Sequence, residues 1–190
     1  MLKYIPLFEL PFLVIMIFMR SIILRKHGIK AIVFGNTNKT DFIIIPFVLF
    51  FFYGLTVGVF NLPFPITIIK PFWNNIVMDI IATIICTISL IWFGLTLKTF
   101  GKSFRVGIDE YSKEDLIVNG TFSISRNPIY VGFLAFFIGI FIAYPNILTS
   151  IFLILFFIMI HRQILREELF LIEHYRNEYN EYCKKVRRYI

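Results

Sequence analysis

The sequence predicts an all-α integral membrane protein with about five transmembrane helices, on the basis of three observations. Of the 190 residues, 58% are hydrophobic and only 16% are charged, whereas an ordinary soluble domain has about 25% charged residues. Several apolar runs approach the roughly 20 residues needed to cross a bilayer. The net charge of +7 comes from loops and the C-terminal tail, so no nucleic-acid partner is expected. The cysteines, Cys86 and Cys183, are too isolated for a disulfide or metal framework.

The first three membrane helices are expected over residues 5–24, 42–60 and 76–97. The second run has no charged residue, and the third has only Asp79, near its start. The first run is longer than the apolar part of a signal peptide, and no small-residue cleavage site follows it, so we expect it to be retained. Together these helices form a predicted N-terminal region, residues 1–97.

The last two membrane helices are predicted to form a helical hairpin. The charge-free stretch 129–160 is too long for one span and short for two. Its Tyr-Pro-Asn sequence at 144–146 is a turn signal that ends one helix and starts another. The arms are therefore expected at 129–144 and 147–164, and the first would be about 24 Å long, barely the thickness of a bilayer core.

Positive charges in the connections predict the orientation of the protein in the membrane. Lysine and arginine concentrate after the first span, in residues 98–128 and in the tail after residue 161, whereas residues 61–75 contain only Lys70. This alternation places the N-terminus outside and the C-terminus in the cytoplasm. The largest polar segments would then share the cytoplasmic face, within a second region, 98–190, that is expected to carry the chemistry.

The tail is expected to be one amphipathic helix that continues the fifth span. Apolar and aromatic residues recur in it at spacings of three and four: Leu165, Leu169, Ile172, Tyr175, Tyr179, Tyr182, Val186 and Tyr189. This pattern gives one apolar stripe on an otherwise charged helix. Such a helix would pack against its own protein or lie along the membrane surface.

Two groups of residues in the polar segments are candidates for chemistry. The first lies around Arg126, which composition alone explains as a boundary anchor, with Asn127-Pro128 as a helix start. The second is the pair Glu167-Glu168 at the end of the fifth span. At about 100° per residue, Glu168 falls on the apolar stripe and Glu167 beside it.

A carboxylate on a packing face needs a charged or hydrogen-bonding partner. For the glutamate pair, that partner is either a protein cation, namely Arg126, Arg162 or Arg166, or the cation of a bound ligand. Charges near a membrane are often functional, and both alternatives remain open at this point. The three histidines lack the spacing of metal ligands, so no metal site is expected.

Two sequence patterns bracket the predicted hairpin. Before it runs Leu116-Ile117-x-x-Gly120-x-Phe122-x-x-x-Arg126-Asn127-Pro128-Ile129-Tyr130, and after it come Arg166-Glu167-Glu168-x-x-Leu171 and Glu178-Tyr179-x-x-Tyr182. In this order the patterns resemble the isoprenylcysteine carboxyl methyltransferase family and the related membrane phospholipid methyltransferases. The resemblance covers roughly residues 90–190.

The resemblance implies a membrane enzyme that transfers a methyl group from S-adenosylmethionine to a lipophilic or small-molecule acceptor, such as the carboxylate of an isoprenylcysteine. It implies cofactor contacts at Glu114, Asp115, Leu116, Ile117, Phe122, Asn127, Pro128, Ile129, Tyr130 and Glu167. Phe122 and Tyr130 would contact the adenine or the sulfonium, and Glu167 would receive the ammonium. Arg162, Arg166 and Glu168 are the candidate catalytic residues, with one of the arginines holding a substrate carboxylate.

The chain departs from the family pattern at two positions. Asn127 stands where the family usually has histidine, so a neutral amide replaces a titratable group. Gln163, next to Arg162, aligns with a family arginine.

Two other functions remain as alternatives: an NADPH-dependent membrane reductase of the sterol-reductase type, against which Ile129 before Tyr130 argues, and a non-catalytic membrane protein that retains the fold.

Overall fold

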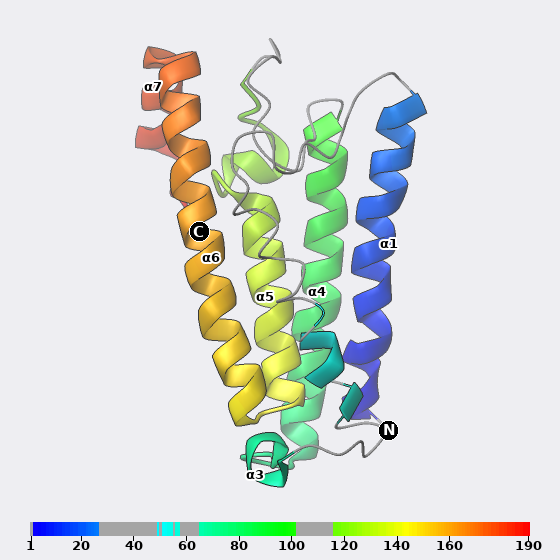
Figure 1. Cartoon of the computed structure of the whole chain (residues 1–190). Helices are drawn as coiled ribbons and strands as arrows, with labels where there is room; N and C mark the ends of the chain where they lie inside the picture. Colours follow the sequence, from blue (N-terminus) through cyan, green and yellow to red (C-terminus); the bar gives the residue numbers. More distant parts are fainter. Residues whose placement is uncertain (1, 27–48, 50, 55, 58–64, 102–115) are drawn as a thin grey trace.

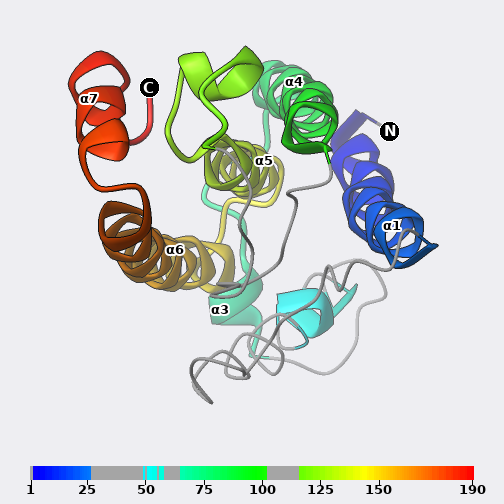
Figure 2. The ribbon, with the colours of Figure 1, turned by 90° about the horizontal axis from the view of Figure 1, so that it is seen from above.

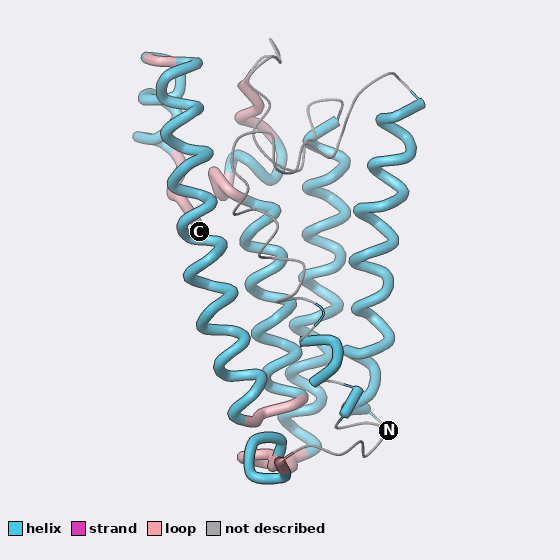
Figure 3. Tube along the Cα trace, in the orientation of Figure 1, coloured by secondary structure: helices cyan, strands magenta, loops and turns pink. Residues whose placement is uncertain are grey.

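The computed structural model describes residues 2–26, 49, 51–54, 56–57, 65–101 and 116–190. Throughout these residues the regular structure is helical and there is no strand (Figure 3). The predicted all-α class is therefore confirmed for the described part of the chain. The span expected over 42–60 lies largely outside it, although residues 51–54 and 56–57 are helical.

Three described helices are long and apolar enough to cross a membrane: α1 (Ile5–Lys26), α4 (Ile76–Phe100) and α6 (Ile147–Tyr175). A shorter apolar helix, α5 (Pro128–Ala143), separates the last two. Further short elements are the 3-10 turns η1 (Leu2–Tyr4) and η4 (Gly120–Ser123), α3 (Ile66–Ile69) and α7 (Asn177–Lys185). The expected spans at 5–24 and 76–97 begin as predicted and extend slightly further.

The four long helices stand side by side in the order α1, α4, α5, α6 (Figures 1 and 2). α1 and α4 run in one direction, and α5 runs opposite to α4 and α6 (Figure 1). The end of α4, the turn η4, the start of α5 and the end of α6 consequently meet at one end of the bundle. The described parts of the two polar segments lie together at that end.

The turn between α5 and α6 forms where the sequence predicts it. α5 ends at Ala143 and α6 begins at Ile147, and the side chain of Asn146 caps α6 by accepting a hydrogen bond from Thr149 N at 2.9 Å. The hydroxyl of Thr149 accepts a hydrogen bond from Asn146 N at 3.2 Å, which completes a reciprocal capping box. The two helices are thereby joined in a fixed antiparallel hairpin.

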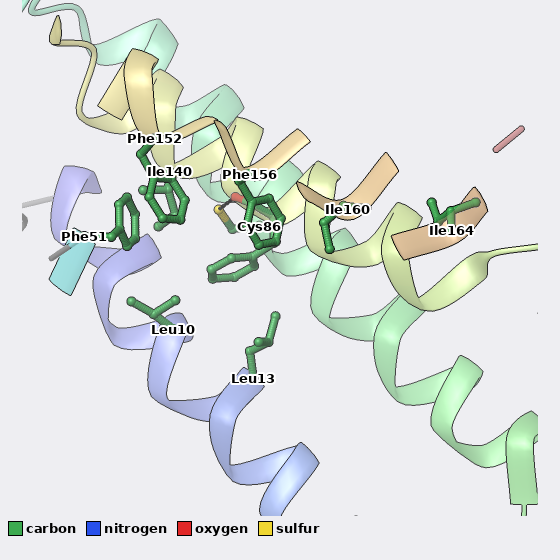
Figure 4. Packing of buried hydrophobic residues seen from close by; sticks show 10 residues of the cluster. Leu10, Leu13, Phe51, Cys86, Ile140, Phe152, Phe156, Ile160 and Ile164 are labelled. Carbon is green, nitrogen blue, oxygen red and sulfur yellow. Dashed lines mark hydrogen bonds between the residues drawn. The ribbon is translucent and has the colours of Figure 1, made fainter. Parts of the chain in front are cut away.

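Buried side chains from all four long helices meet in a shared core cluster (Figure 4). The labelled members are Leu10, Leu13, Phe51, Cys86, Ile140, Phe152, Phe156, Ile160 and Ile164. α4 and α5 approach closely because residue 139 is glycine, and a Cβ there would overlap the Sγ of Cys86. This packing fixes the relative positions of α4, α5 and α6, whose ends carry the candidate site.

The expectation of a single C-terminal helix is wrong. α6 ends at Tyr175, and the chain turns at Arg176, whose φ is +49°, before α7 begins. The turn folds α7 back, so that Tyr179 and Tyr182 are buried and the Tyr182 hydroxyl donates to the carbonyl of Phe122 at 2.6 Å. Apolar spacing of three and four residues occurs on both sides of the turn, although Leu165, Leu169 and Ile172 on α6 are exposed whereas Tyr179 and Tyr182 on α7 are buried. Periodicity alone therefore cannot reveal the reversal.

Candidate functional site at one end of the bundle

The turn before α5 is held between α4 and α7. Gly120 has φ +57°, and a Cβ at this position would lie 2.6 Å from the Oγ1 of Thr99 on α4, so both backbone conformation and space favour glycine. The ring of Phe122 is buried and meets the ring of Phe100 edge-on at 4.9 Å. On its other side, the carbonyl of Phe122 accepts the hydrogen bond from the Tyr182 hydroxyl. These contacts fix the position of the residues that lead into α5.

Asn127 and Pro128 connect this turn to the helices around it. Pro128 is the first residue of α5, as predicted, and its carbonyl accepts a hydrogen bond from the indole of Trp92 at 2.7 Å. Asn127 does not cap the helix with its side chain. Its amide instead donates to Glu168 Oε1 on α6 at 3.1 Å and to the carbonyl of Arg188 at 3.2 Å. Asn127 therefore links α5, α6 and the C-terminal segment.

Glu168 is a buried carboxylate with two cationic neighbours. Its Oε2 accepts from Arg188 Nε at 2.9 Å and lies 2.8 Å from Arg188 Nη2, and its Oε1 lies 3.7 Å from Arg126 Nη1. The Glu168 side chain is only 7% exposed, so this charge depends on its partners. The ion-pair alternative is thus correct for Glu168, with Arg126 among the expected cations and Arg188 as an unexpected one.

Glu167 has a different environment from its neighbour. It is half-buried, and its Oε1 accepts from the Tyr130 hydroxyl at 2.5 Å and from the side-chain amide of Gln163 at 2.9 Å. Neither of these two donors carries a charge. The pair formed by Tyr130 and Glu167 joins the first turn of α5 to α6, one residue away from the contact between Asn127 and Glu168.

The structure brings together four of the residues predicted from the sequence: Asn127, Tyr130, Glu167 and Glu168. Of the other candidates, Phe122 and Pro128 are buried, and Leu116, Ile117 and Ile129 are half-buried. Arg162 is exposed and Arg166 is half-buried, and neither forms an ion pair within the described part of the chain. Glu114 and Asp115 lie outside the described residues.

Sequence reasoning missed the contribution of α7 and the C-terminal segment. The hydrogen bond to Glu168 raises the pKa of the Arg188 guanidinium and so favours its charged form. Burial raises the pKa values of Tyr179 and Tyr182, so both hydroxyls stay neutral at physiological pH. The Tyr179 hydroxyl is buried and has no hydrogen-bond partner among the described residues. Only the shortage of a cation for a buried glutamate could have pointed to Arg188 in advance.

Comparison with known proteins identifies the family of the chain. The family model described as phospholipid methyltransferase matches residues 76–178, more than half of the chain. The chain belongs to the phospholipid methyltransferase family. As a member of this family of membrane methyltransferases, it has its α4–α6 helices and both halves of the candidate site inside the matched region. Arg188 lies beyond that region.

Two curated rice proteins are similar to this phospholipid methyltransferase family member. Both are named probable protein-S-isoprenylcysteine O-methyltransferase, one from Oryza sativa subsp. indica and one from subsp. japonica. Each is 28% identical over 123 residues, a match that spans 62% of this chain and 62% of the relative. No solved structure matches the chain. The resemblance drawn from the two sequence patterns is therefore confirmed at the level of the family.

Proposed function

We propose that the protein is an integral membrane methyltransferase that uses S-adenosylmethionine and modifies a carboxylate on a lipophilic or small-molecule acceptor, such as an isoprenylcysteine. The family and the three long apolar helices support the first part of this proposal. The names of the two rice relatives support the acceptor class. In this proposal the region 98–190 carries the site, and residues 1–97 supply membrane helices that pack against it.

The observation that carries the proposal is the pair formed by Tyr130 and Glu167. The carboxylate is half-buried and is oriented by two neutral donors, Tyr130 and Gln163, at 2.5 and 2.9 Å. A partly desolvated carboxylate held in this way suits the ammonium of the cofactor's amino-acid part, because a charge-assisted hydrogen bond gains strength where water is partly excluded.

The two carboxylates differ in accessibility, because Glu168 is buried whereas Glu167 is half-buried and can be reached by a ligand. Both Glu168 oxygens already have partners, namely Asn127 and Arg126 on one and Arg188 on the other. Its charge is matched within the protein, so we assign it a structural role. The described donors and acceptors thus fit the cofactor at Glu167, with Tyr130 as its orienting neighbour.

When bound, S-adenosylmethionine supplies a methyl group that is already activated by the positive sulfonium. The protein then has to align the acceptor, and a carboxylate acceptor is already ionised at neutral pH and needs no general base. Arg166 is better placed than Arg162 to hold that acceptor, because it is half-buried beside Glu167 whereas Arg162 is exposed. Its guanidinium would bind the carboxylate through a charge-assisted pair.

The proposal also assigns an orientation. The polar end of the bundle, which holds the start of α5 and the end of α6, would face the cytoplasm, in line with the distribution of lysine and arginine in the loops. The water-soluble cofactor would enter from that side. A lipophilic acceptor would enter sideways from the bilayer, between helices.

Methyl transfer in membranes tests the proposal. Membranes that contain the protein, and matched membranes that lack it, are incubated with methyl-labelled S-adenosylmethionine, and lipid and small-molecule extracts are compared by mass spectrometry. We expect a labelled methyl ester only where the protein is present. Label on a nitrogen or a sulfur would contradict the carboxylate acceptor, and no protein-dependent label in any extract would contradict the methyltransferase assignment.

A further inference from the structure

The last residues of the chain fold back onto the segment that starts α5. The carbonyl of Arg187 accepts a hydrogen bond from Arg126 N at 2.9 Å. The carbonyl of Arg188 accepts two more, from Ser125 Oγ at 3.3 Å and from Asn127 Nδ2 at 3.2 Å. Three consecutive residues before α5 are therefore bound to the backbone of two consecutive residues of the C-terminal segment.

The side chain of Arg188 reaches α6 from the same place. Its Nε and Nη2 bind Glu168 Oε2 at 2.9 and 2.8 Å, while Asn127 binds the other oxygen of the same carboxylate at 3.1 Å. The next residue, Tyr189, contacts α6 about two turns earlier, where its hydroxyl lies 2.6 Å from His161 Nδ1. Arg188 thus joins the start of α5 through its backbone and α6 through its guanidinium.

This junction lies directly beside the candidate cofactor residues. Glu167 precedes Glu168 on α6, and Tyr130 follows Asn127 by three residues, one turn along α5. A fixed contact between Asn127 and Glu168 sets the relative register of the two helices at that level. The same register sets the 2.5 Å contact between Tyr130 and Glu167, since site residues keep their geometry only when neighbouring contacts hold their backbones.

We propose that Arg188 is a positioning residue for this site, acting through Asn127 and Glu168. The part of the inference that concerns the cofactor rests on the function proposed above. Arg188 lies outside the region matched by the family model, residues 76–178. Its side chain is 36% exposed while the Glu168 side chain is 7% exposed, so its loss leaves a buried carboxylate short of its main cation and removes the contact that joins the C-terminal segment to Glu168 on α6.

The test compares three variants of the full chain in detergent: Arg188→Ala, Arg188→Lys, and Lys185→Ala as a control. Lys185 is exposed in the last turn of α7, so its replacement removes the same charge three residues away from Arg188. The dissociation constant for S-adenosylhomocysteine, the demethylated product, is measured well below each melting temperature. We expect it to rise about tenfold in Arg188→Ala, equivalent to one charge-assisted hydrogen bond, and to stay at the parental value in Lys185→Ala.

The lysine variant separates charge from geometry. An ammonium keeps the charge but cannot make the two-pronged contact of a guanidinium, so we expect a smaller rise, about threefold. A merely structural Arg188 would lower the melting temperature without changing affinity in the folded protein. Parental affinity in folded Arg188→Ala overturns the proposal, and if that variant does not fold, parental affinity in Arg188→Lys overturns it.

Hydrogen exchange gives a second readout that needs no ligand. Deuterium uptake is compared for peptides that cover 125–131 and 164–170, and we expect faster uptake in both for the Arg188 variants but not for Lys185→Ala. If the parental protein binds neither S-adenosylmethionine nor its product, the proposed function fails, and exchange alone then decides the structural part. Unchanged protection of both peptides in the Arg188 variants overturns that part.

Discussion

Replacing Glu167 with glutamine removes one charge from the candidate cofactor site and keeps the shape of the side chain. The amide oxygen of glutamine can still accept hydrogen bonds from Tyr130 and Gln163, which donate to Glu167 Oε1 in the parental protein. The substitution therefore isolates the electrostatic role of the carboxylate from its structural role.

The structure sets the expected size of each effect. If Glu167 receives the cofactor ammonium, the variant loses a hydrogen bond between charged groups, which is equivalent to about 1.5–3 kcal/mol. Affinity for S-adenosylmethionine should then fall roughly ten- to hundredfold. Because Tyr130 and Gln163 are neutral donors and keep an acceptor in the variant, the free energy of unfolding should change by less than about 1 kcal/mol.

Both quantities are measured on the same purified sample, affinity by titration calorimetry and stability by thermal unfolding. Glu173→Gln is the matched control, because Glu173 is exposed on the same helix and its replacement removes the same charge. We expect the control to retain parental affinity and stability. A Glu167→Gln protein that is unstable but still binds the cofactor with parental affinity would refute the assignment of Glu167.

Three further predictions follow from the same site. Tyr130→Phe removes the hydroxyl that orients Glu167 and should weaken binding of S-adenosylhomocysteine by about 1 kcal/mol, measured by calorimetry, with little change in melting temperature. Glu168→Gln leaves Arg188 and Arg126 without their carboxylate and should lower the free energy of unfolding by about 2–4 kcal/mol, measured by thermal or denaturant unfolding; an unchanged value would contradict the structural role. For the orientation, a reporter fused after residue 190 should be cytoplasmic and one inserted near Asn146 external, and the reverse result would misplace the site.

Much of the fold could be predicted because each signal was local. The length of an apolar run that crosses a bilayer follows the bilayer thickness, so such runs are easy to recognise. The runs that start at residues 5 and 76 correctly predicted the first residues of α1 and α4. The turn between α5 and α6 followed from a Pro-Asn pair, and the Asn146 cap explains why α6 starts at Ile147. These features depend on residues within one or two turns of each other.

The C-terminal reversal could not be predicted, because its cause is tertiary. Arg176 adopts a positive φ, although it is not the glycine that such a turn usually has. The apolar spacing continues on both sides of it. The turn is stabilised by the burial of Tyr179 and Tyr182. The hydrogen bond from Tyr182 to the carbonyl of Phe122 in η4 spans 60 residues of sequence. A periodic apolar pattern shows which residues share a face of a helix but not which partner, if any, buries that face.

The candidate site was predicted in part for the same reason. The adjacent pair of glutamates was recognised, and Glu168 is buried as expected. Its neighbours in the predicted stripe, Leu165, Leu169 and Ile172, are exposed, so the stripe did not identify the buried face of α6. The cation for Glu168 was expected to be Arg126, Arg162 or Arg166, and Arg126 does lie 3.7 Å from Glu168. The closer cation, Arg188, lies 20 positions along the chain and reaches Glu168 only because the chain folds back. From sequence alone, the basic C-terminal residues were indistinguishable from an ordinary solvated run of charges.

Binding of the demethylated cofactor to the purified parental protein tests the central claim most directly. Titration of the full chain in detergent with S-adenosylhomocysteine should give saturable binding with one site per chain, and a parallel titration with NADPH should give none. Saturable binding of NADPH, or no binding of either S-adenosylhomocysteine or S-adenosylmethionine to folded protein, would contradict the account of the site at Tyr130 and Glu167.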